Sequence, residues 1–452
     1  MLRRTLAKGA VALTTAGIVG AGQAVAQQAP VEIQFWHGLT QPLGGMLEQV
    51  AADFNASQQR YRINATYRGG YGETMVAAIA AFRANNAPHI VQMFEVGTAT
   101  MMAATRATKP VWELLQQAGV KIDFDDVLAG VRGYYSLPDG RMASMPFNSS
   151  TSVAFYNKDM FRKAGLDPEQ FPKTWPAVAE AARKLKAAGI ANPMTTSWPT
   201  WLMVEQFSAI HDIPLATKGN GFGGLDTELA INNPLMVRHM QNLIDWHKEG
   251  IFRYGGRDSA ADGMLPAGEC AMTFASSGTR ARIKKEARFE WGTAMLPYYD
   301  DVPKAPLNSI IGGASLWAMN KGASTGRSDA EWKGIAEFFA WLAKPDVAAK
   351  WHTDTGYLPL TRSGYERVKA SGFYKENVGA DIPIEQMLRG GGTLTENSRG
   401  IRLGGFAEIR NIIQEEMEKA FQGQQDAKTL LENATRRGNV VLRNFERANR
   451  NG

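Results

Sequence analysis

The stretch VEIQFWHG at residues 31–38 alternates apolar and polar side chains, a pattern that predicts a β-strand. Residues 41–59 follow with apolar side chains at helical spacing, and YRINATYRG at 61–69 again predicts a strand. A second helical pattern at 71–86 leads into HIVQMFEVG at 89–97, which is mostly apolar and predicts a central strand. This alternation of strands and helices predicts an α/β unit with a mainly parallel sheet.

The residues that directly follow these three strands are candidates for ligand contact. In an open α/β sheet, ligands bind beyond the carboxyl ends of the strands. The candidates are Trp36 and His37, the segment 69–71, and the segment 95–98.

The remainder of the chain is richer in predicted helix. Strands are expected at 270–278 and, as a bent strand or a strand pair, at 308–320. Amphipathic helices are expected at 174–189, at 234–249 with Gly250 as its terminator, on both sides of Pro345 within 330–356, at 406–421 and at 426–445. There is no repeat with a period of 20 to 50 residues and no Pro- or Ser-rich linker.

The first 26 residues differ from the rest and predict a secretory signal peptide. Arg3, Arg4 and Lys8 precede an uncharged apolar segment, and the small residues AVA at 24–26 form a cleavage signature near Ala26. A membrane anchor is the alternative, but the apolar segment is short for a span of about 20 residues. Export by the general secretory route and by the twin-arginine route both remain open.

The number of cysteines and the net charge indicate the cellular compartment of the protein and the classes of partner it binds. Cys270 is the only cysteine, so no intramolecular disulfide and no lipid anchor near the cleavage site are possible. These features predict an exported, unanchored protein of a bacterial periplasm. The net charge is +6, of which three charges lie in residues 1–26, and no basic stripe typical of nucleic-acid binding is present.

The sequence motifs give no support for an enzyme, a metal site or a cofactor. The six histidines form no H-x-x-x-H pair, and one cysteine cannot build a zinc site. GNGFGG at 219–224 matches G-x-G-x-x-G but lacks the preceding strand and the following helix, so a loop or lid is expected there. No G-x-S-x-G motif occurs, and no partner is placed by sequence to activate Ser276 or Ser277.

Aromatic and hydroxyl-rich segments are the remaining candidates for binding. Trp198 lies in the loop TTSWPTW at 195–201, where a half-exposed indole is available to a ligand. The run NSSTS at 148–152 is compatible with a turn, a serine nucleophile or a binding site. Arg402 lies in the glycine-containing stretch RGIRLGG; such a residue is usually solvated, although arginine is well suited to bind phosphate or carboxylate.

Two long segments, VAFYNKDMFRKAGLDPEQFPKTW at 153–175 and AWLAKPDVAAKWHTDTGYLPLT at 340–361, resemble the bacterial extracellular solute-binding proteins that serve ABC importers. The resemblance implies a two-lobed periplasmic-binding-protein fold (type II-like), with α/β lobes joined by hinge strands that close on the ligand. The expected division is 1–26 signal peptide, 28–148 with 299–350 as the N-terminal lobe, and 149–298 with 351–452 as the C-terminal lobe.

Other stretches, among them FEVGTATMMAATRATKP, PFNSST, TFASSGT, IIGGASLW and TGYLPLT, are similar to the members of this family that bind glycerol-3-phosphate. The implied ligands are glycerol-3-phosphate and glycerophosphodiesters such as glycerophosphocholine. The implied partners are an ABC permease and its ATPase, with the binding protein a monomer that is not an enzyme. An oligosaccharide-binding protein of the same fold and a periplasmic glycerophosphodiesterase are the alternatives.

The resemblance also implies eight ligand-binding residues. They are Tyr71, Glu95, Ser150, Trp198, Ser276, Gly313, Tyr357 and Arg402. The hydroxyl groups, the arginine and the glycine backbone N–H would donate to the phosphate. Glu95 would accept from the glycerol hydroxyls, and Trp198 would cover the carbon chain or a choline. Ser150 would lie where the chain crosses between the lobes.

Overall fold

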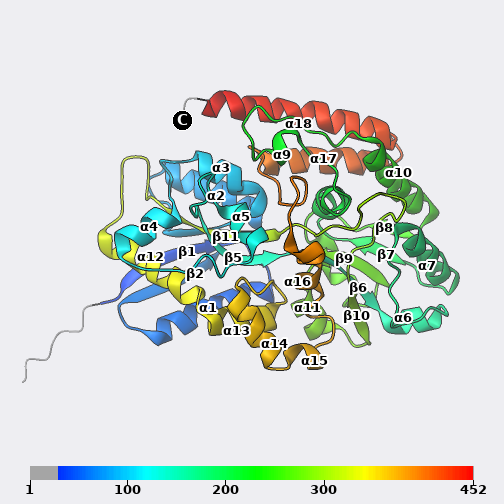
Figure 1. The fold of residues 1–452 in the computed structure, drawn as a ribbon, viewed down its shortest axis with the longest axis horizontal. Helices are drawn as coiled ribbons and strands as arrows, with labels where there is room; N and C mark the ends of the chain where they lie inside the picture. The colour runs from blue at the N-terminus through cyan, green and yellow to red at the C-terminus, as the bar shows by residue number, and fades with distance from the viewer. Residues whose placement is uncertain (1–28, 451–452) are drawn as a thin grey trace, which may run out of the picture.

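The computed structural model describes residues 29–450 and consists of two α/β lobes that lie side by side (Figure 1). Each lobe has one sheet flanked by helices. The predicted fold class is therefore confirmed. The predicted signal peptide and its cleavage site near Ala26 lie outside the described residues.

The first sheet has six strands in the order β2-β1-β3-β11-β4, with β5 also pairing β11. Strand β1 runs parallel to β2 and β3, whereas β11 is antiparallel to β3, β4 and β5. The strand bounds are β1 Val31–His37, β2 Tyr61–Tyr67, β3 Ile90–Phe94, β4 Thr108–Lys109, β5 Met145–Ser150 and β11 Gly312–Met319.

The second sheet has five strands in the order β10-β6-β9-β7-β8. Strand β7 is parallel to β8 and β9, and β6 is antiparallel to β9 and β10. The bounds are β6 Ser152–Asn157, β7 Met194–Thr196, β8 Phe252–Tyr254, β9 Met272–Ser276 and β10 Trp291–Ala294.

The prediction of mainly parallel sheets is wrong, because both sheets are mixed. The antiparallel pairings involve the strands next to the crossings between the lobes. Strand β5 continues through Thr151 directly into β6, and β11 enters the first sheet from the segment that follows β10. Of the strands at these crossings, β11 runs against β3 in the first sheet and β6 runs against β9 in the second.

Helices cover both faces of the two sheets. In the first half of the chain they are α1 Leu43–Ser57, α2 Tyr71–Arg83, α3 Thr98–Ala103, α4 Val111–Ala118, α5 Ala129–Tyr135, α6 Lys158–Lys163, α7 Trp175–Ala187, α8 Phe207–Ile210 and α9 Thr217–Asn220. In the second half they are α10 Pro234–Glu249, α11 Thr279–Glu286, α12 Asp329–Leu342, α13 Pro345–Thr355, α14 Arg362–Ala370, α15 Phe373–Glu376, α16 Ile382–Met387, α17 Phe406–Phe421 and α18 Ala427–Asn449. The short 3-10 helices are η1 Glu95–Gly97, η3 Ala260–Gly263 and η4 Arg389–Gly392, and η2 Trp201–Gln206 is a π-helix.

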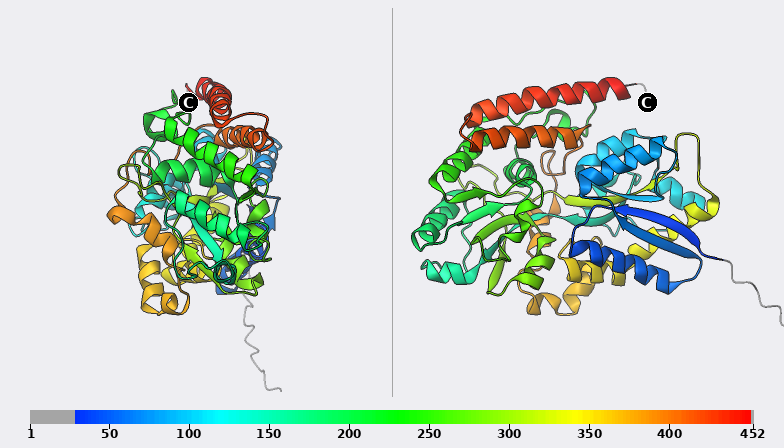
Figure 2. Two further views of the ribbon diagram at one scale, coloured as in Figure 1. Left: turned by 90° about the vertical axis from the view of Figure 1, so that its right-hand side faces the viewer. Right: turned by 180° about the vertical axis from the view of Figure 1, so that it is seen from behind.

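The sequence places several helix ends correctly for local reasons. Helix α10 begins after Asn233, whose side chain accepts a hydrogen bond from the Met236 N–H, and it ends at Gly250 in the left-handed conformation. The break before Pro345 separates α12 from α13 as predicted. Helices α17 and α18 lie side by side over one edge of the second lobe (Figure 2).

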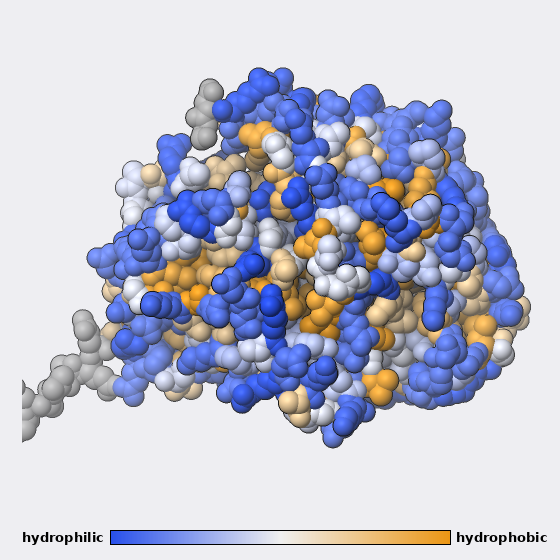
Figure 3. All heavy atoms as spheres, in the orientation of Figure 1, coloured by the Kyte–Doolittle hydropathy of each residue, from blue (hydrophilic) through white to orange (hydrophobic). Residues whose placement is uncertain are grey.

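Three clusters of buried hydrophobic residues support the fold, and the one with the most residues extends across both lobes. The core of the first lobe contains Phe35 and Phe338, and it also contains Trp351, Tyr357 and Leu358. Residues 351–360 therefore pack with the first sheet, and the predicted division at residue 350 stays a prediction. Figure 3 shows hydrophilic side chains over most of one face, with hydrophobic ones reaching the surface in the middle and over the first lobe. Within residues 29–450, no helix is long and apolar enough to cross a membrane.

Candidate ligand-binding site

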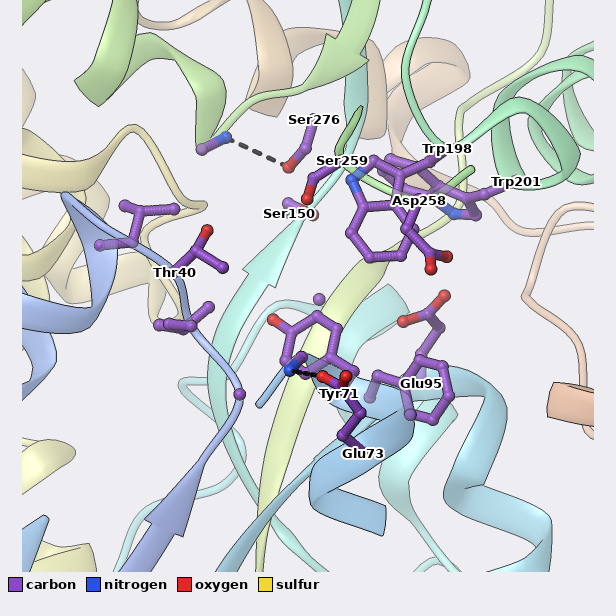
Figure 4. Close-up of a pocket in the computed structure, with 18 of the residues that line it drawn as sticks. Thr40, Tyr71, Glu73, Glu95, Ser150, Trp198, Trp201, Asp258, Ser259 and Ser276 are labelled. Carbon is purple, nitrogen blue, oxygen red and sulfur yellow. Dashed lines mark hydrogen bonds between the residues drawn. The ribbon is translucent and has the colours of Figure 1, made fainter. Parts of the chain in front are cut away.

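A cavity of about 830 Å³ lies between the lobes and is lined by residues of both (Figure 4). The first lobe contributes the ends of β1 and β3, the start of α2, and residues of β5 and β11. The second lobe contributes the loop after β7, η3 and its preceding loop, the end of β9 and one face of α17. Seven of the eight predicted site residues line it: Tyr71, Glu95, Ser150, Trp198, Ser276, Gly313 and Tyr357.

A chain of hydrogen bonds orients the hydroxyl group of Tyr71. The Gly38 N–H donates to Gln92 (2.8 Å), the Gln92 amide donates to Asn148 (2.8 Å), and the Asn148 amide donates to the Tyr71 hydroxyl oxygen (2.7 Å). The Tyr71 hydroxyl also hydrogen-bonds with the Tyr357 hydroxyl, so the two phenol groups line the cavity as a pair. Burial raises the pKa of Tyr71 well above its usual value, so the hydroxyl stays protonated.

Aromatic rings form one wall of the cavity. The ring of Tyr71 stacks on Phe94 with centroids 5.5 Å apart, and Trp198 lies 6.2 Å from Tyr71 at a tilt of 42°. Trp198 has a φ of +48°, an uncommon value for a bulky residue, and its backbone N–H donates to the Asp258 carbonyl oxygen (2.7 Å). Such strain persists where the surroundings impose it and often marks a functional position.

Hydroxyl groups from the two lobes meet at the crossing. Ser150 ends β5, where it pairs with Gly312, and Ser276 ends β9, where its Oγ accepts a hydrogen bond from the Gly278 N–H (3.2 Å). Gly313 has a φ of +83°, and a Cβ there would overlap the carbonyl oxygen of Asn148. Only glycine fits, because β5 approaches β11 so closely at this point.

An arginine that is held by two carboxylates forms the opposite side. Arg410 on α17 donates from Nε and Nη2 to Glu205 (2.8 Å each) and from Nη2 to Glu95 (2.7 Å), and all three side chains are buried. Burial raises the pKa of Glu95, with Arg410 acting in the opposite direction. Burial opposes the charge of Arg410 as well, but Glu205 and Glu95 outweigh it and raise its pKa. The Nη1 group of Arg410 makes no hydrogen bond within residues 29–450.

Three further carboxyl groups line the cavity: Glu73, Asp258 and Asp262. Figure 4 shows the carboxyl groups of Asp258 and Glu95 pointing toward one another from opposite lobes, with Trp198 beside Asp258. Burial raises the pKa of Asp262 to about 6, and its Oδ1 has no hydrogen-bond partner in the described part of the chain. The cavity thus has four carboxyl groups but a single arginine, which is already paired.

Backbone N–H groups at helix starts provide donors that carry no full charge. Gly70 and Tyr71 at the start of α2, and Gly278 and Thr279 at the start of α11, line the cavity. The unpaired N–H groups of a first helical turn favour anions. One of these groups is already used at each helix, because the Gly70 N–H donates to the Glu73 side chain and the Gly278 N–H donates to the Ser276 Oγ.

The structure does not bring Arg402 to this cavity. Its Nη2 group donates to the carbonyl oxygens of Gly133 (3.1 Å), Tyr134 (2.8 Å) and Ser136 (2.8 Å), which turn the side chain toward α5. Arg410, eight residues later, is the arginine that lines the cavity.

The position of Arg410 on the predicted helix at 406–421 is the signal in the sequence that could have identified it as a site residue. Arg410 follows Phe406 by four residues and adjoins Ile409, so it falls on the apolar face of α17. A charged residue on that face must be paired when it is buried. Asp258 and Asp262 lie in a loop and a short 3-10 helix, where no periodicity distinguishes them from solvated acids.

Neither the histidines nor the acids form a metal site in the described chain. Among residues 29–450 there is no group of three or more His, Cys, Asp or Glu side chains that could hold a metal ion. His37 is fully buried, and burial lowers its pKa to about 4.

Comparison with known proteins places the chain among transport proteins. The family model described as bacterial extracellular solute-binding protein matches residues 49–380. The chain is 45% identical over 423 residues to the sn-glycerol-3-phosphate-binding periplasmic protein UgpB of Yersinia pseudotuberculosis, covering 93% of this chain and 94% of that protein. It is 44% identical over 450 residues to the protein of the same name from Pectobacterium atrosepticum, covering 99% and 100%.

Solved structures show the same fold. UgpB from Mycobacterium tuberculosis in complex with glycerophosphocholine superposes with a TM-score of 0.73 at 21% identity, covering 92% of this chain and 99% of that one. The cyclic alpha-maltosyl-1,6-maltose binding protein from Arthrobacter globiformis gives a TM-score of 0.70 at 22% identity, covering 92% and 100%.

Proposed function

The chain belongs to the bacterial extracellular solute-binding proteins, and on that premise we propose that it binds glycerol-3-phosphate and glycerophosphodiesters such as glycerophosphocholine in the cavity between its lobes. It would act in the periplasm as a monomer, after cleavage of residues 1–26, and deliver its ligand to the permease of an ABC importer that is driven by an ATPase. The single observation that carries the proposal is the combination of phosphate donors, carboxylates and an indole in one interlobe cavity.

Uncharged donors and one arginine would hold the phosphate. The Tyr71 hydroxyl, Ser150, Ser276 and the Thr279 N–H at the start of α11 surround the crossing, and the Nη1 group of Arg410 adds a charged donor. Arg402 is not needed for this role, and Arg410 replaces it. Tyr357 and Gly313, which also line the cavity, complete the wall around the phosphate.

The glycerol hydroxyls would be bound by Glu95. Its Oε1 accepts from Arg410, and the Oε2 makes no hydrogen bond in the described chain, so it can accept from a ligand hydroxyl. Arg410 and Glu205 fix the carboxylate in place.

The charge of the cavity favours a ligand that carries a cation as well as a phosphate. The single arginine is neutralised by Glu95 and Glu205, while Asp258, Asp262 and Glu73 form no ion pair within residues 29–450. A quaternary ammonium group could lie between Trp198 and Asp258, where the indole face and the carboxylate both attract it. Glycerophosphocholine therefore suits the cavity better than the dianion of glycerol-3-phosphate.

Closure of the lobes would enclose the ligand. The proposed lobes are 28–148 with 299–350 and 149–298 with 351–452. At the crossing, the Thr151 hydroxyl donates to the Ile310 carbonyl (2.8 Å) and hydrogen-bonds with the Ser309 hydroxyl (2.7 Å), and the Gln206 amide donates to the Ile310 carbonyl (2.8 Å) and accepts from its N–H (3.1 Å). Gln206 belongs to η2, the π-helix that also carries Trp201 and Glu205, so the hinge and the site share one element.

Calorimetric titration with glycerol-3-phosphate, glycerophosphocholine and maltose, followed by product analysis, tests this function. We expect binding of the two phosphate compounds, no heat with maltose and no hydrolysis product. Binding of maltose alone would identify an oligosaccharide-binding protein, and release of choline or glycerol would identify a glycerophosphodiesterase. Either result would refute the proposal.

A further inference from the structure

We propose that a second cavity, between α5 of the first lobe and the loops 219–224 and 394–402 of the second, binds an oxyanion of the phosphate class. The cavity measures about 640 Å³ and does not share a lining residue with the interlobe cavity described above. Figure 1 shows α5 at the edge of the first lobe that faces the second lobe.

Three arginines and no carboxylate line this second cavity. They are Arg132, Arg399 and Arg402. Arg132 is paired with Asp125, which stands outside the cavity. Arg399 and Arg402 have no ion pair with any residue of the described range 29–450. A cavity with two uncompensated guanidinium groups attracts an anion from solution.

The two unpaired guanidinium groups converge on one aromatic ring. The Cζ of Arg399 lies 4.4 Å, and that of Arg402 4.2 Å, from the centroid of Phe222. Cation–π contact orients both groups but does not neutralise them. Burial and then the charge of Arg399 lower the pKa of Arg402 to about 10, which reflects the cost of placing two like charges together.

Hydrogen bonds position these groups and leave donors unused. Arg402 uses only Nη2, for the three carbonyl groups of α5 and the residue after it, and Arg399 makes one long bond, from Nη2 to the Gly219 carbonyl (3.4 Å). The Nε groups of both arginines are buried and have no partner within residues 29–450. The Nη1 groups of both arginines also make no hydrogen bond within residues 29–450 but are not enclosed, so a bound oxyanion would accept hydrogen bonds from them.

The loop with the sequence GNGFGG contributes Phe222 to the lining of the cavity. A Cβ at Gly221 would overlap the Arg402 carbonyl oxygen, and a Cβ at Gly219 would lie only 2.5 Å from Arg399 Nη2. The glycines thus let both arginine segments approach the loop closely. The same loop presents Phe222 to both guanidinium groups.

The ligand is defined by its charge and by the size of the cavity. Arginine forks match the oxygen geometry of phosphate. The volume exceeds that of a bare phosphate ion, so the source is either free phosphate or the phosphate group of a larger ester. Because the lining residues come from both lobes, an anion there would also bridge the lobes.

The test is a calorimetric titration of the full mature chain with inorganic phosphate, and in a second arm with glucose-6-phosphate, in a phosphate-free buffer of low salt. We expect one phosphate site in the wild type, with an affinity that falls roughly ten-fold or more in Arg399→Gln, since this change removes a charged hydrogen-bond donor. Tighter binding of glucose-6-phosphate would identify a larger ester as the ligand, and tighter binding of phosphate would identify the free ion.

Arg436→Gln is the matched control, because Arg436 is exposed on α18 and has no ion pair in the described chain. It should leave phosphate affinity unchanged. Both variants should keep the wild-type Tm in phosphate-free buffer, since Arg399 makes only one long hydrogen bond. Absence of phosphate binding in the wild type, or equal affinity in wild type and Arg399→Gln, would overturn the proposal without bearing on glycerophosphocholine binding between the lobes.

Discussion

The two cavities of this protein differ in whether their arginines are paired with carboxylates. In the interlobe cavity Arg410 is held by Glu95 and Glu205, and three further carboxyl groups stand nearby. In the second cavity Arg399 and Arg402 have no carboxylate partner in residues 29–450. In the interlobe cavity, carboxylates of the protein therefore balance the charge of the arginine. In the second cavity, a bound anion would balance the charge of the two arginines.

This difference bears on what each cavity can bind. A buried arginine that is already paired serves as a fixed hydrogen-bond donor. It therefore orients an anionic ligand but adds little net electrostatic attraction. The surplus of carboxyl groups then favours a ligand with a positive group of its own. The arginine-rich cavity favours a simple oxyanion, which carries only negative charge.

The largest expected effect comes from removing the paired arginine. Arg410→Gln would leave Glu95 and Glu205 buried without their cation, and breaking such a pair costs about 3–5 kcal/mol of unfolding free energy. Chemical denaturation measures this loss. Arg183→Gln, which breaks a half-exposed pair with Glu249, should cost about 1 kcal/mol or less. Equal losses in the two variants would mean that the interlobe pair is not buried in solution.

Substitution of one glycine beside each cavity tests whether the two cavities bind their ligands independently. Gly313→Ala and Gly221→Ala each force a Cβ against a backbone carbonyl at positive φ, and each should lower stability by about 1–3 kcal/mol. Only Gly313→Ala should weaken glycerophosphocholine binding, and only Gly221→Ala should weaken phosphate binding. Gly165→Ala has a similar φ of +69° but open space around its Cβ, so it isolates the conformational cost. Loss of both ligands in one variant would mean that the cavities are not independent.

The buried carboxyl group of Asp262 predicts a dependence of stability on pH. Its pKa of about 6 lies above the usual value near 3.8, so the folded state binds more protons between these values and loses stability as the pH rises through them. Asp262→Asn should remove this loss and raise stability at pH 7 by about 1–2 kcal/mol, with no gain below pH 4. Thermal unfolding across pH 4 to 8 measures it. The exposed Asp245→Asn should show no such gain, and a flat difference between Asp262→Asn and wild type would contradict the burial of this group.

The smallest effect is expected at the indole wall. Trp198→Ala should weaken glycerophosphocholine binding by roughly ten-fold, which corresponds to about 1–2 kcal/mol for a cation–π contact. Glycerol-3-phosphate has no cation, so its affinity should fall less. Direct titration of both ligands gives the ratio. An equal loss for both would place the choline elsewhere in the cavity.

Local patterns predicted much of the fold. Alternation gave β1 and β2, helical spacing gave α1, α2, α7 and α10, and Gly250 and Pro345 marked helix ends where the structure has them. The mixed sheets could not be predicted in this way. Strand direction there depends on where the chain crosses between lobes, which is a long-range property and leaves no periodic signal.

The candidate site was predicted mainly through the resemblance. Pattern alone pointed to Tyr71 and Glu95, because both follow strands, and it only raised the question of the run at 148–152. Arg402 lies in a glycine-containing loop whose conformation no pattern fixes, and the carbonyl groups of α5 draw it away from the interlobe cavity. The paired acids and Arg410 depend on contacts between residues more than 200 positions apart. Whether the lining residues contact ligand stays a prediction.

The ratio of dissociation constants for glycerophosphocholine and glycerol-3-phosphate tests most directly the view that the interlobe cavity neutralises its own arginine. Both are measured by calorimetry on the wild type, in the same buffer at neutral pH. The predicted result is that both ligands bind and that glycerophosphocholine binds roughly ten-fold tighter or more, as a cation–π contact beside a carboxylate would provide. Tighter binding of glycerol-3-phosphate, or binding of neither compound, would contradict it.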